Sequence, residues 1–374
     1  MFIGKCKLKD IAESTGVEQV GITSAEPLYY MRERLERRVN EGRISPFEEK
    51  DPDLRISPAQ LLVNCRTIIT LAVPYATSFH PVPETKEEPR GIVARCARGI
   101  DYHHIIENKA NRIVEALKLE VAIPFKYRIL ADRSPLMERE LAGNSGLGWI
   151  GENCTLINPR YGSYTVLGTI LIDKYIEPDE KIIHSCLSCG QCREACPTSA
   201  ITEPYTMDPF RCISYLTQAS GIFPRNMRPA LGAQIYGCDR CQEACPHNQS
   251  RESSAISELA FSYFSANPLL IPLLELTRKE FEMTIGLTSA GWRGKTNLQR
   301  NVIIALGNIG DQIAIKPLAR LLENDPRPLI RLHAAWALGQ IGGRKAAFAL
   351  GKSSLRDPEP AVREEAKLAL DKSS

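Results

Sequence analysis

Residues 186–197 read Cys186-Leu-Ser-Cys189-Gly-Gln-Cys192-Arg-Glu-Ala-Cys196-Pro197, and the spacing of these cysteines decides how the chain is interpreted. The 374 residues include 12 cysteines, and eight of them lie between Cys186 and Cys245. Disulfide frameworks are typical of small secreted chains, whose cysteines are spread along the sequence. Cysteines gathered as Cys-x-x-Cys pairs in the middle of a long chain instead indicate a reducing compartment and a bound metal.

The first cysteine run has the spacing of bacterial ferredoxins, in which three thiolates bind one iron–sulfur cluster and a fourth, followed by proline, binds a second. The second run, Cys238-x-x-Cys241-x-x-x-Cys245-Pro246, lacks one cysteine, and Cys212 can supply it. We therefore expect two 4Fe–4S clusters, one bound by Cys186, Cys189, Cys192 and Cys245 and the other by Cys196, Cys212, Cys238 and Cys241.

Zinc is the alternative metal, since two closed four-cysteine sites would use the same eight thiolates. The spacing of the first run, with its final Cys-Pro, favours iron–sulfur. Two clusters form a path for electrons, so we expect a redox acceptor in the N-terminal part of the chain. The four remaining cysteines are scattered and are expected to be small buried side chains: Cys6, Cys65, Cys96 and Cys154.

Residues 1–175 mix helical and strand patterns and are numerous enough for a core of their own. We expect an α/β or α+β domain here, with a long loop marked by Pro74, Pro81, Pro83 and Pro89. The amphipathic and apolar patterns predict helices at Leu28–Val39 and His104–Leu119, and strands at Arg66–Val73, Tyr127–Ala131 and Thr165–Ile172.

The last part of the chain contains a 32-residue repeat. Leu306-Gly-Asn-Ile-Gly310 recurs as Leu338-Gly-Gln-Ile-Gly342, and Asp325-Pro-Arg-Pro328 recurs as Asp357-Pro-Glu-Pro360. Helices separated by proline turns at a fixed period are typical of an α-helical solenoid. We expect HEAT-like repeats over residues 296–374, either as a structural cap or as a surface for a macromolecule. The whole chain is then an α+β fold in which residues 176–250 form a ferredoxin-like domain organised by its metal.

The bulk composition sets softer limits. A count of 47 basic against 44 acidic residues is too balanced to indicate nucleic-acid binding by itself. A local basic patch is still compatible with this composition. Met1–Asp10 lacks the hydrophobic core of a signal peptide. No apolar stretch approaches the roughly 20 residues that span a bilayer. We expect a soluble, cytoplasmic protein without membrane contact.

Gly146-Leu-Gly148-Trp-Ile-Gly151 satisfies the GxGxxG pattern of dinucleotide sites. That pattern binds a dinucleotide only between a strand and a helix. Residues 136–141 look helical and residues 152–159 look like strand and turn, so we expect a tight loop against another flat cofactor instead of NAD or FAD. Asp101-Tyr-His-His104 begins like the Asp-x-His-x-x-Gly cobalamin motif but continues to Ile106 where that motif has glycine.

Nearly the whole chain resembles the epoxyqueuosine reductases, which act in the last step of queuosine synthesis in tRNA. Its first two domains are also similar to those of corrinoid-dependent reductive dehalogenases, which lack the solenoid. Besides the cysteine runs, the resemblance rests on Gly99-Ile-Asp-Tyr-His103, Leu130-Ala-Asp132 through Glu138-Arg139, Gly146–Gly151, Arg211–Gln218, Tyr236–Asp239, Gly291–Lys295 and Gln299–Asn301.

The resemblance implies that the N-terminal domain binds base-off cobalamin and that the enzyme removes the epoxide oxygen of epoxyqueuosine at the tRNA wobble position. It implies Asp132 as the proton donor and an external one-electron reductant of the flavodoxin or ferredoxin type. Residues 251–295 then connect the domains through a tRNA-contacting loop, and a monomer is expected. The implied corrinoid contacts are Arg55, Asp132, Leu156, Leu167, Gln218 and Asp239; the implied tRNA contacts are Arg139, Trp292, Arg293, Gly294 and Lys295.

The chemistry of these residues suits such a reaction. An acid near the epoxide helps because ring opening places negative charge on oxygen, and burial against the macrocycle is expected to raise the pKa of Asp132 so that it carries a proton. Arg293, Lys295 and Arg300 are expected to form a small basic patch with Trp292 for phosphates and bases.

Two other classes of function compete with a tRNA epoxide reductase. A small-molecule corrinoid reductase of the dehalogenase kind would, in its exported forms, begin with a twin-arginine signal, but Arg37-Arg38 lies within a predicted helix. A non-enzymatic electron carrier with a binding solenoid would leave residues 1–175 and Asp132 without a role.

Overall fold

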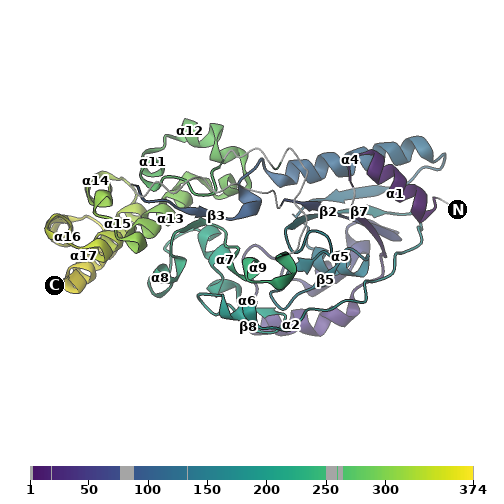
Figure 1. Ribbon diagram of the computed structural model, residues 1–374, viewed down its shortest axis with the longest axis horizontal. Helices are drawn as coiled ribbons and strands as arrows, with labels where there is room; N and C mark the ends of the chain where they lie inside the picture. Colours follow the sequence, from purple (N-terminus) through teal and green to yellow (C-terminus); the bar gives the residue numbers. More distant parts are fainter. Residues whose placement is uncertain are drawn as a thin grey trace. The chain divides into compact units, whose positions relative to one another are not determined.

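The computed structural model describes residues 3–17, 19–75, 88–132, 134–249, 259 and 264–373 (Figure 1). The chain forms two compact units, each assembled from separated stretches of sequence. The first unit comprises Met1–Ser78, Asp101–Phe210 and Arg240–Ala260, and the second comprises Phe79–Ile100, Arg211–Asp239 and Phe261–Ser374. Pro81 and Pro83 of the expected loop lie outside the described residues. The four-domain division at residues 175, 250 and 295 stays a prediction.

A four-stranded antiparallel sheet forms the centre of the first unit, with the strand order β1-β2-β7-β4. Its strands are β1 (Val20–Ser24), β2 (Thr67–Pro74), β7 (Thr165–Ile172) and β4 (Tyr127–Leu130). The three predicted strands are thereby confirmed, and β1 is an additional one. β2 and β7 pair along their full length, with Thr67 opposite Ile172 and Pro74 opposite Thr165.

Successive side chains of each strand point to opposite faces of the sheet, so both faces carry apolar residues. Helices cover both faces. Ile69 of β2 packs in one apolar cluster with α1 (Lys5–Ser14) and α4 (Tyr102–Glu120). Its neighbour Ile68 packs on the other face with α2 (Arg32–Asn40), α3 (Pro52–Ile56) and α5 (Glu138–Asn144). Both predicted helices are present, as α2 with its preceding 3-10 turn Tyr29–Met31 and as α4. A further 3-10 turn spans Pro58–Gln60.

The cysteine-rich segment of the first unit has little regular structure. It contains the short helices α6 (Gln191–Glu194) and α9 (Arg240–Glu243), the hairpin β8 (Ile201–Glu203) and β9 (Thr206–Met207), and 3-10 turns at Pro209–Arg211 and Pro246–Asn248. Polar contacts fix its end to the loop before β7. Oδ1 of Asn248 accepts the amide of Ser163 at 2.8 Å, and Nδ2 of Asn248 donates to Oγ of Ser163 at 2.9 Å.

The second unit begins with a two-stranded parallel sheet of β3 (Ile92–Val93) and β10 (Gln234–Tyr236). The long helix α13 (Gly294–Ile309) packs against β10 and against several short helices. These helices are α7 (Ile213–Gln218), α8 (Arg228–Leu231) and α11 (Leu270–Glu275). The unit also contains α12 (Arg278–Met283) and 3-10 turns at Arg95–Ala97, Arg225–Met227, Ile285–Leu287 and Ser289–Arg293.

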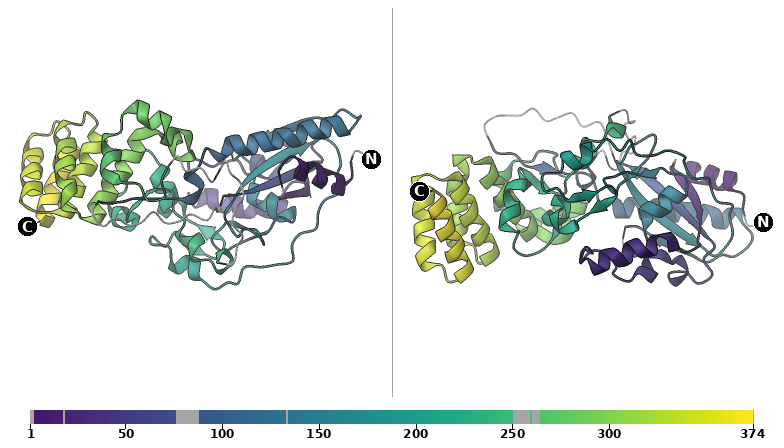
Figure 2. Two further views of the ribbon diagram at one scale, coloured as in Figure 1. Left: turned by 45° about the horizontal axis from the view of Figure 1, so that its top comes forward. Right: turned by 90° about the horizontal axis from the view of Figure 1, so that it is seen from below.

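The predicted solenoid is present at the end of the second unit, where helices stack side by side (Figure 2). Helix α13 contacts α15, and α15 contacts α17. The 32-residue period has a packing cause. A Cβ on Gly307 would lie 2.8 Å from Cα of Ala337, and a Cβ on Gly339 would lie 2.9 Å from Cα of Ala369. The stack consists of α13, α14 (Ile315–Asn324), α15 (Pro328–Ile341), α16 (Arg344–Arg356) and α17 (Pro360–Ser373), with a 3-10 turn at Gln312–Ala314.

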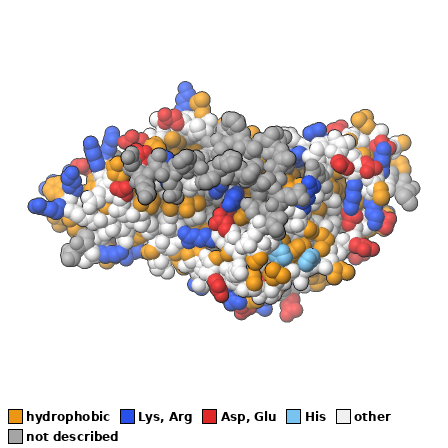
Figure 3. All heavy atoms as spheres, in the orientation of Figure 1, with side chains coloured by type: hydrophobic (Ala, Val, Ile, Leu, Met, Phe, Trp, Pro, Cys, Tyr) orange, Lys and Arg blue, Asp and Glu red, His pale blue; other side chains and the backbone are white. Residues whose placement is uncertain are grey.

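The surface carries charges of both signs. On the coloured part of the face in Figure 3, basic and acidic side chains are interspersed, as the near balance of 47 and 44 residues predicts. Among the described residues, no helix is both long enough and apolar enough to cross a membrane.

Candidate functional site

Four cysteines of the first unit line one pocket. They are the four expected ligands of the first cluster, although Cys245 lies more than 50 residues beyond the other three in sequence. The pocket is completed by residues of the hairpin of β5 (Trp149–Ile150) and β6 (Leu156–Ile157) and of the turn after Cys245. Its lining consists of Cys186, Cys189, Cys192 and Cys245 with Gly151, Glu152, Asn153, Ile157, Leu187, Gly190, Pro246 and His247.

The electrostatics of this pocket suit thiolates that bind a positively charged group. Burial, followed by the nearby Glu152 and the other cysteines, raises the pKa of Cys192 to about 11. Burial and the neighbouring Cys186 and Cys189 also raise the pKa of Cys245. Neighbouring thiols resist ionisation because their thiolates repel one another. They release their protons when iron binds, because the positive charge of the metal compensates that repulsion.

Two hydrogen-bond donors beside the pocket also fit an iron–sulfur cluster. Trp149 stacks on His184 at 4.6 Å between ring centroids and meets His247 edge-on at 5.1 Å. Nε1 of Trp149 and Nε2 of His247 are buried and have no hydrogen-bond partner within the described part of the chain. Trp149 packs against Cys245. Donors of this kind can bond to cluster sulfur, a contact that sets cluster potentials.

The other four expected ligands are divided between the two units. Cys196 and Cys241 belong to the first unit, and Cys212 and Cys238 belong to the second. The amide of Ala200 donates to Sγ of Cys196 at 3.2 Å. Among the described residues, no three His, Cys, Asp or Glu side chains form a group able to hold a single metal ion. The assignment of these four cysteines to a second cluster stays a prediction.

The GxGxxG segment forms a hairpin and not a dinucleotide loop. Helix α5 precedes it, and β5 (Trp149–Ile150) pairs with β6 (Leu156–Ile157) after it. A Cβ on Gly148 would lie 2.2 Å from the carbonyl oxygen of Ile157, so glycine is needed for strand approach. Gly151 instead lines the cysteine pocket. The expected helix-loop-strand order is therefore confirmed.

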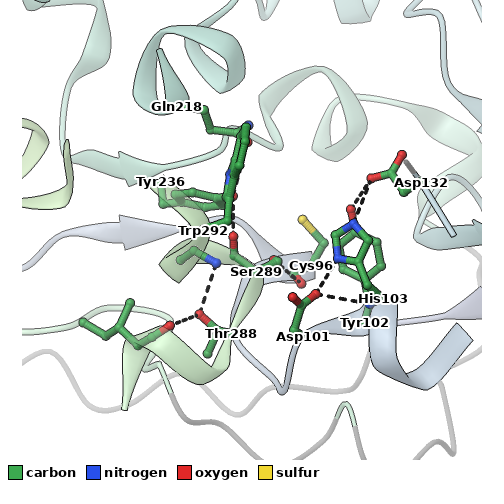
Figure 4. A network of polar contacts seen from close by, with 12 residues as sticks. Cys96, Asp101, Tyr102, His103, Asp132, Gln218, Tyr236, Thr288, Ser289 and Trp292 are labelled. Carbon is green, nitrogen blue, oxygen red and sulfur yellow. Dashed lines mark hydrogen bonds and ion pairs between the residues drawn. The ribbon is translucent and has the colours of Figure 1, made fainter. Parts of the chain in front are cut away.

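Asp132 lies in the loop between β4 and α5, with its side chain 53% exposed. Its φ of 51° is in the left-handed region, which a non-glycine residue adopts at a cost and which is frequent at functional sites. The hydroxyl of Tyr102 donates to Oδ2 of Asp132 (Figure 4). Nε2 of His103 lies 3.7 Å from the same oxygen. The described residues therefore leave about half of the Asp132 side chain exposed.

His103 is oriented by a second carboxylate. Nδ1 of His103 lies 2.5 Å from Oδ1 of Asp101, which also accepts the His103 amide at 3.1 Å and so caps α4. Burial raises the pKa of Asp101, but the hydrogen bonds from His103 outweigh it and lower this pKa below its usual value. Tyr102 and His103 stack with their ring centroids 4.3 Å apart. The start of α4 therefore presents two polar side chains to Asp132.

Glu138, at the start of α5, is the other ionisable neighbour of Asp132. Its Oε1 is buried and has no hydrogen-bond partner among the described residues. Burial and the charge of Asp132 raise the pKa of Glu138 well above its usual value, against the opposing effects of Arg139 and of a hydrogen bond from the Asp132 amide.

The expected corrinoid contacts of the first unit form two groups. Leu156 and Leu167 lie in one small apolar cluster with Ala72, Ala142 and Leu147. Arg55 forms an ion pair with Glu48 over 3.0 Å, while its Nε is buried and lacks a partner among the described residues. Burial lowers the pKa of Arg55 despite that ion pair. An apolar wall and an unsatisfied donor fit a macrocycle that carries amide side chains.

In the second unit, Gln218 accepts hydrogen bonds from two of the expected tRNA contacts, Trp292 and Arg293 (Figure 4). Oε1 of Gln218 accepts a hydrogen bond from Nε1 of Trp292 at 3.0 Å and lies 3.2 Å from the hydroxyl of Tyr236. Its backbone carbonyl accepts Nε of Arg293 at 2.8 Å. Asp239 is buried and accepts the Arg95 amide at 2.7 Å.

Arg300 does not belong to the exposed basic patch in which we expect it. Arg300 is 1% exposed and donates to the carbonyls of Leu216, at 2.9 Å, and Ala219, at 2.6 Å, around the end of α7. It therefore caps α7, whose exposed carbonyls attract a cation. Burial, then Arg293 and Arg228, lowers the pKa of Arg300 to about 10.

The remaining expected tRNA contacts are more accessible. Trp292 is 52% exposed, and Arg293 lies over its ring at 4.8 Å from the centroid. Lys295 donates to the Leu276 carbonyl at 2.8 Å, and Gly294 has a φ of 77°, which favours glycine. In the first unit, the exposed Arg139 donates to the Cys154 carbonyl at 2.9 Å.

The four cysteines outside the cluster runs are less buried than expected. Cys6, on α1, is exposed, and Cys65, Cys96 and Cys154 are half-buried. Cys6 lies on the polar side of an amphipathic helix, where a small side chain is tolerated in solvent. None of the four lines the cysteine pocket.

Comparison with known proteins identifies the family. Residues 55–133 match the model described as "Epoxyqueuosine reductase QueG, DUF1730", residues 185–248 match "4Fe-4S double cluster binding domain", and residues 293–371 match "HEAT repeats". The epoxyqueuosine reductase of Bacillus subtilis is 36% identical over 334 residues, which is 89% of this chain and 86% of that protein. The Escherichia coli K12 enzyme is 34% identical over 340 residues, 88% of each chain. The chain belongs to the epoxyqueuosine reductase family.

Solved structures of epoxyqueuosine reductases match over the whole fold. One, with an epoxyqueuosine-modified tRNA stem loop, has a TM-score of 0.94 at 34% identity, covering 99% of this chain and 98% of the other. Another, from Bacillus subtilis with its catalytic aspartate loop swung out of the active site, has a TM-score of 0.94 at 34% identity, covering 99% of both chains. The present chain is therefore an oxidoreductase with a 4Fe–4S binding domain and HEAT repeats.

Sequence reasoning missed two parts of this epoxyqueuosine reductase site. The motif Gly99–His103 supports the resemblance, but nothing in its pattern shows that Tyr102 and His103 face Asp132, 30 residues later. Glu138 is followed by Arg139, a pair that is typical of a solvated helix surface, so its burial has no sequence signal.

Proposed function

We propose that the chain reduces epoxyqueuosine to queuosine at the wobble position of tRNA, the final step of queuosine synthesis. The observation that carries the proposal is the match to epoxyqueuosine reductases over nearly the whole chain, which includes the Asp132 loop and the cysteine pocket. In this reaction both carbon–oxygen bonds of the epoxide break, a carbon–carbon double bond forms, and the oxygen leaves as water. The step consumes two electrons and two protons.

The electrons come from an external one-electron reductant of the flavodoxin or ferredoxin type. Two 4Fe–4S clusters are proposed to relay them singly, one bound in the pocket of Cys186, Cys189, Cys192 and Cys245, and one bound by Cys196, Cys212, Cys238 and Cys241. The four-cysteine pocket, its mutually repelling thiols and the description of the matching family model support this assignment.

Base-off cobalamin is the proposed redox cofactor, and when bound it supplies a strongly reducing cobalt centre for the epoxide. The residues proposed to hold it are Arg55, Asp132, Leu156, Leu167, Gln218 and Asp239. The apolar cluster of Leu156 and Leu167 and the unpartnered Nε of Arg55 support this choice.

Asp132 is proposed to donate a proton to the oxygen of the opening epoxide. The hydroxyl of Tyr102 bonds to its Oδ2 and holds the carboxyl in one orientation. Asp101 fixes the ring of His103, whose Nε2 lies 3.7 Å from the same oxygen and adds a second polar group beside the carboxyl.

The tRNA is proposed to contact Trp292, Arg293, Gly294 and Lys295 in the second unit and Arg139 in the first. Arginine and an exposed aromatic ring suit contacts to phosphates and to unstacked bases of an anticodon loop. A monomeric, cytoplasmic enzyme is part of the same proposal, as is a domain order of cofactor domain (1–175), ferredoxin-like domain (176–250), connecting segment (251–295) and HEAT-like repeats (296–374).

The test is conversion of the modified nucleoside. The full chain with reconstituted clusters, cobalamin and a one-electron reductant is incubated with epoxyqueuosine-containing tRNA, and digested nucleosides are analysed for loss of one oxygen by mass spectrometry. We expect conversion by the wild type and a loss of about 10²–10⁴-fold in Asp132→Asn. Asp53→Asn, which changes another exposed aspartate of the first unit, is the matched control. Full turnover by Asp132→Asn with cobalamin bound contradicts the proposed proton donor.

A further inference from the structure

The reaction proposed above needs two protons, whereas Asp132 holds one at a time. A second source must therefore lie within reach of Asp132, or each turnover must wait for solvent after the first transfer. The loop between β4 and α5 brings one further carboxyl to this place, that of Glu138.

Glu138 combines two features that an ordinary surface carboxylate lacks. Its Oε1 is buried without a hydrogen-bond partner among the described residues. The charge of Asp132, six residues earlier in the chain, acts on its carboxyl, so the two residues are electrostatic neighbours. Burying an ionised, unpaired carboxylate oxygen is costly, and a protonated carboxyl avoids that cost.

We infer that Glu138 is a proton-holding residue that stores the second proton beside Asp132 and passes it on during turnover; this inference rests on the proposed role of Asp132. Asp132 gives the first proton to the epoxide oxygen and becomes a carboxylate. The neutral Glu138 carboxyl then transfers its proton to that carboxylate, and Asp132 delivers it to the departing oxygen as water forms. Glu138 is reprotonated from solvent after the turnover.

The surrounding charges agree with this role. Burial and the charge of Asp132 both favour the neutral form of Glu138, and only Arg139 and the Asp132 amide oppose it. Asp132 also accepts a hydrogen bond from Tyr102, and the ring of His103, which lies 3.7 Å from the same oxygen, is held by Asp101. The Asp132 carboxyl is therefore influenced both by the Glu138 carboxyl and by the His103–Asp101 pair.

The experiment uses Glu138→Gln in the full, reconstituted chain. Glutamine matches the shape of the neutral carboxyl but cannot release a proton. We expect turnover to fall by about 10²-fold and the fall of activity at high pH, where wild-type Glu138 loses its proton, to disappear from the pH profile of the residual rate. Glu138→Asp keeps an acid in place and should recover part of the rate. Glu140→Gln, on the same helix, is the matched control. The charges that act on the Glu140 carboxyl are those of Arg34 and Lys181, and Asp132 is not among them.

A second readout does not depend on activity. Infrared difference spectra of the chain without cobalamin should contain a protonated carboxyl band at neutral pH that is absent from Glu138→Gln and retained in Glu140→Gln. Absence of this band in the wild type overturns the inference. Unchanged turnover and pH profile in Glu138→Gln, together with an inactive Asp132→Asn, also overturn it and leave the proposed function standing. Full turnover by Asp132→Asn instead overturns the proposed proton donor.

Discussion

The indole Nε1 of Trp292 donates a hydrogen bond to Oε1 of Gln218 over 3.0 Å. Trp292 is an expected tRNA contact, and Gln218 is an expected corrinoid contact. The same Nε1 lies 3.0 Å from the hydroxyl of Tyr236, and that hydroxyl donates to the Ser289 carbonyl at 2.6 Å. The half-exposed ring of Trp292 is therefore held by its polar edge, and the guanidinium of Arg293 lies over the ring, 4.8 Å from its centroid.

Replacing Trp292 separates the role of the ring from that of its edge. Trp292→Ala should weaken binding of the tRNA stem loop by about 1–3 kcal/mol, the usual cost of a lost stacking platform. Trp292→Phe keeps an aromatic face but loses the Nε1 donor, so we expect a smaller loss of about 1 kcal/mol. Fluorescence anisotropy of labelled tRNA measures both. Phe348→Ala, which removes a 78% exposed aromatic ring from α16, should leave binding unchanged. An equal loss in Phe348→Ala would argue against a stacking role for Trp292.

Arg293 should contribute through phosphate charge. Arg293→Gln should reduce the slope of log affinity against log salt by about 0.7–0.9, the effect of one lost phosphate contact. The measurement is a salt titration of tRNA binding. Arg278→Gln is the control, because Arg278 is 88% exposed and paired with Glu282 on α12. If both variants keep the wild-type slope, Arg293 does not neutralise a phosphate.

The repeated and apolar parts of the fold could be predicted from the sequence. The strand at Thr165–Ile172 is a short run rich in Ile, Val, Leu and Thr. The 32-residue period follows from Gly307 and Gly339, where only glycine lets successive helices touch. Such patterns are local or periodic, so they can be recognised in the sequence without knowledge of the tertiary structure. The spacing of the cysteines also grouped Cys186, Cys189, Cys192 and Cys245, which line one pocket in the structure; their assignment to a cluster stays a prediction.

Polar residues that become buried could not be predicted. Arg300 follows Arg293 and Lys295 and is expected on their basic surface, yet it faces the end of α7, where Asn301 joins it by donating to the carbonyls of Thr217 and Ile235 at 2.8 Å. A charged residue that bonds to backbone carbonyls looks the same in sequence as one in solvent. The partner carbonyls lie more than 60 residues away, and only the fold brings them together.

His333 should make the stability of the second unit depend on pH. It is fully buried on α15, where Nδ1 donates to the Leu329 carbonyl at 2.7 Å and Nε2 accepts the Phe223 amide at 3.2 Å. This pairing requires the neutral ring. Burial, followed by the charge of Arg228, lowers the pKa of His333 from 6.5 to about 3.

The sign of the effect follows from proton binding. Between pH 6.5 and 3 the unfolded chain binds a proton at His333 and the folded chain does not, so stability falls as pH falls, by at most about 1.4 kcal/mol per pH unit. Denaturant unfolding between pH 7 and 5 should show a shallower decline in His333→Asn than in the wild type. His104→Gln, which changes an exposed histidine of α4, should keep the wild-type decline. Identical pH dependence in wild type and His333→Asn would contradict the buried neutral ring.

Cysteine substitutions test how many clusters the chain binds and which cysteines bind each cluster. Cys192→Ser removes a thiolate from the four-cysteine pocket and should halve the iron content and the absorbance near 400 nm of anaerobically reconstituted protein. Cys212→Ser should remove the other half, and the double variant should be colourless, because each set of four thiolates holds its own cluster. Cys154→Ser, which removes a half-buried cysteine of the first unit outside the pocket, should retain all the iron. A colourless wild type that binds zinc would contradict iron–sulfur clusters, and complete loss of iron in Cys192→Ser alone would contradict two independent sets.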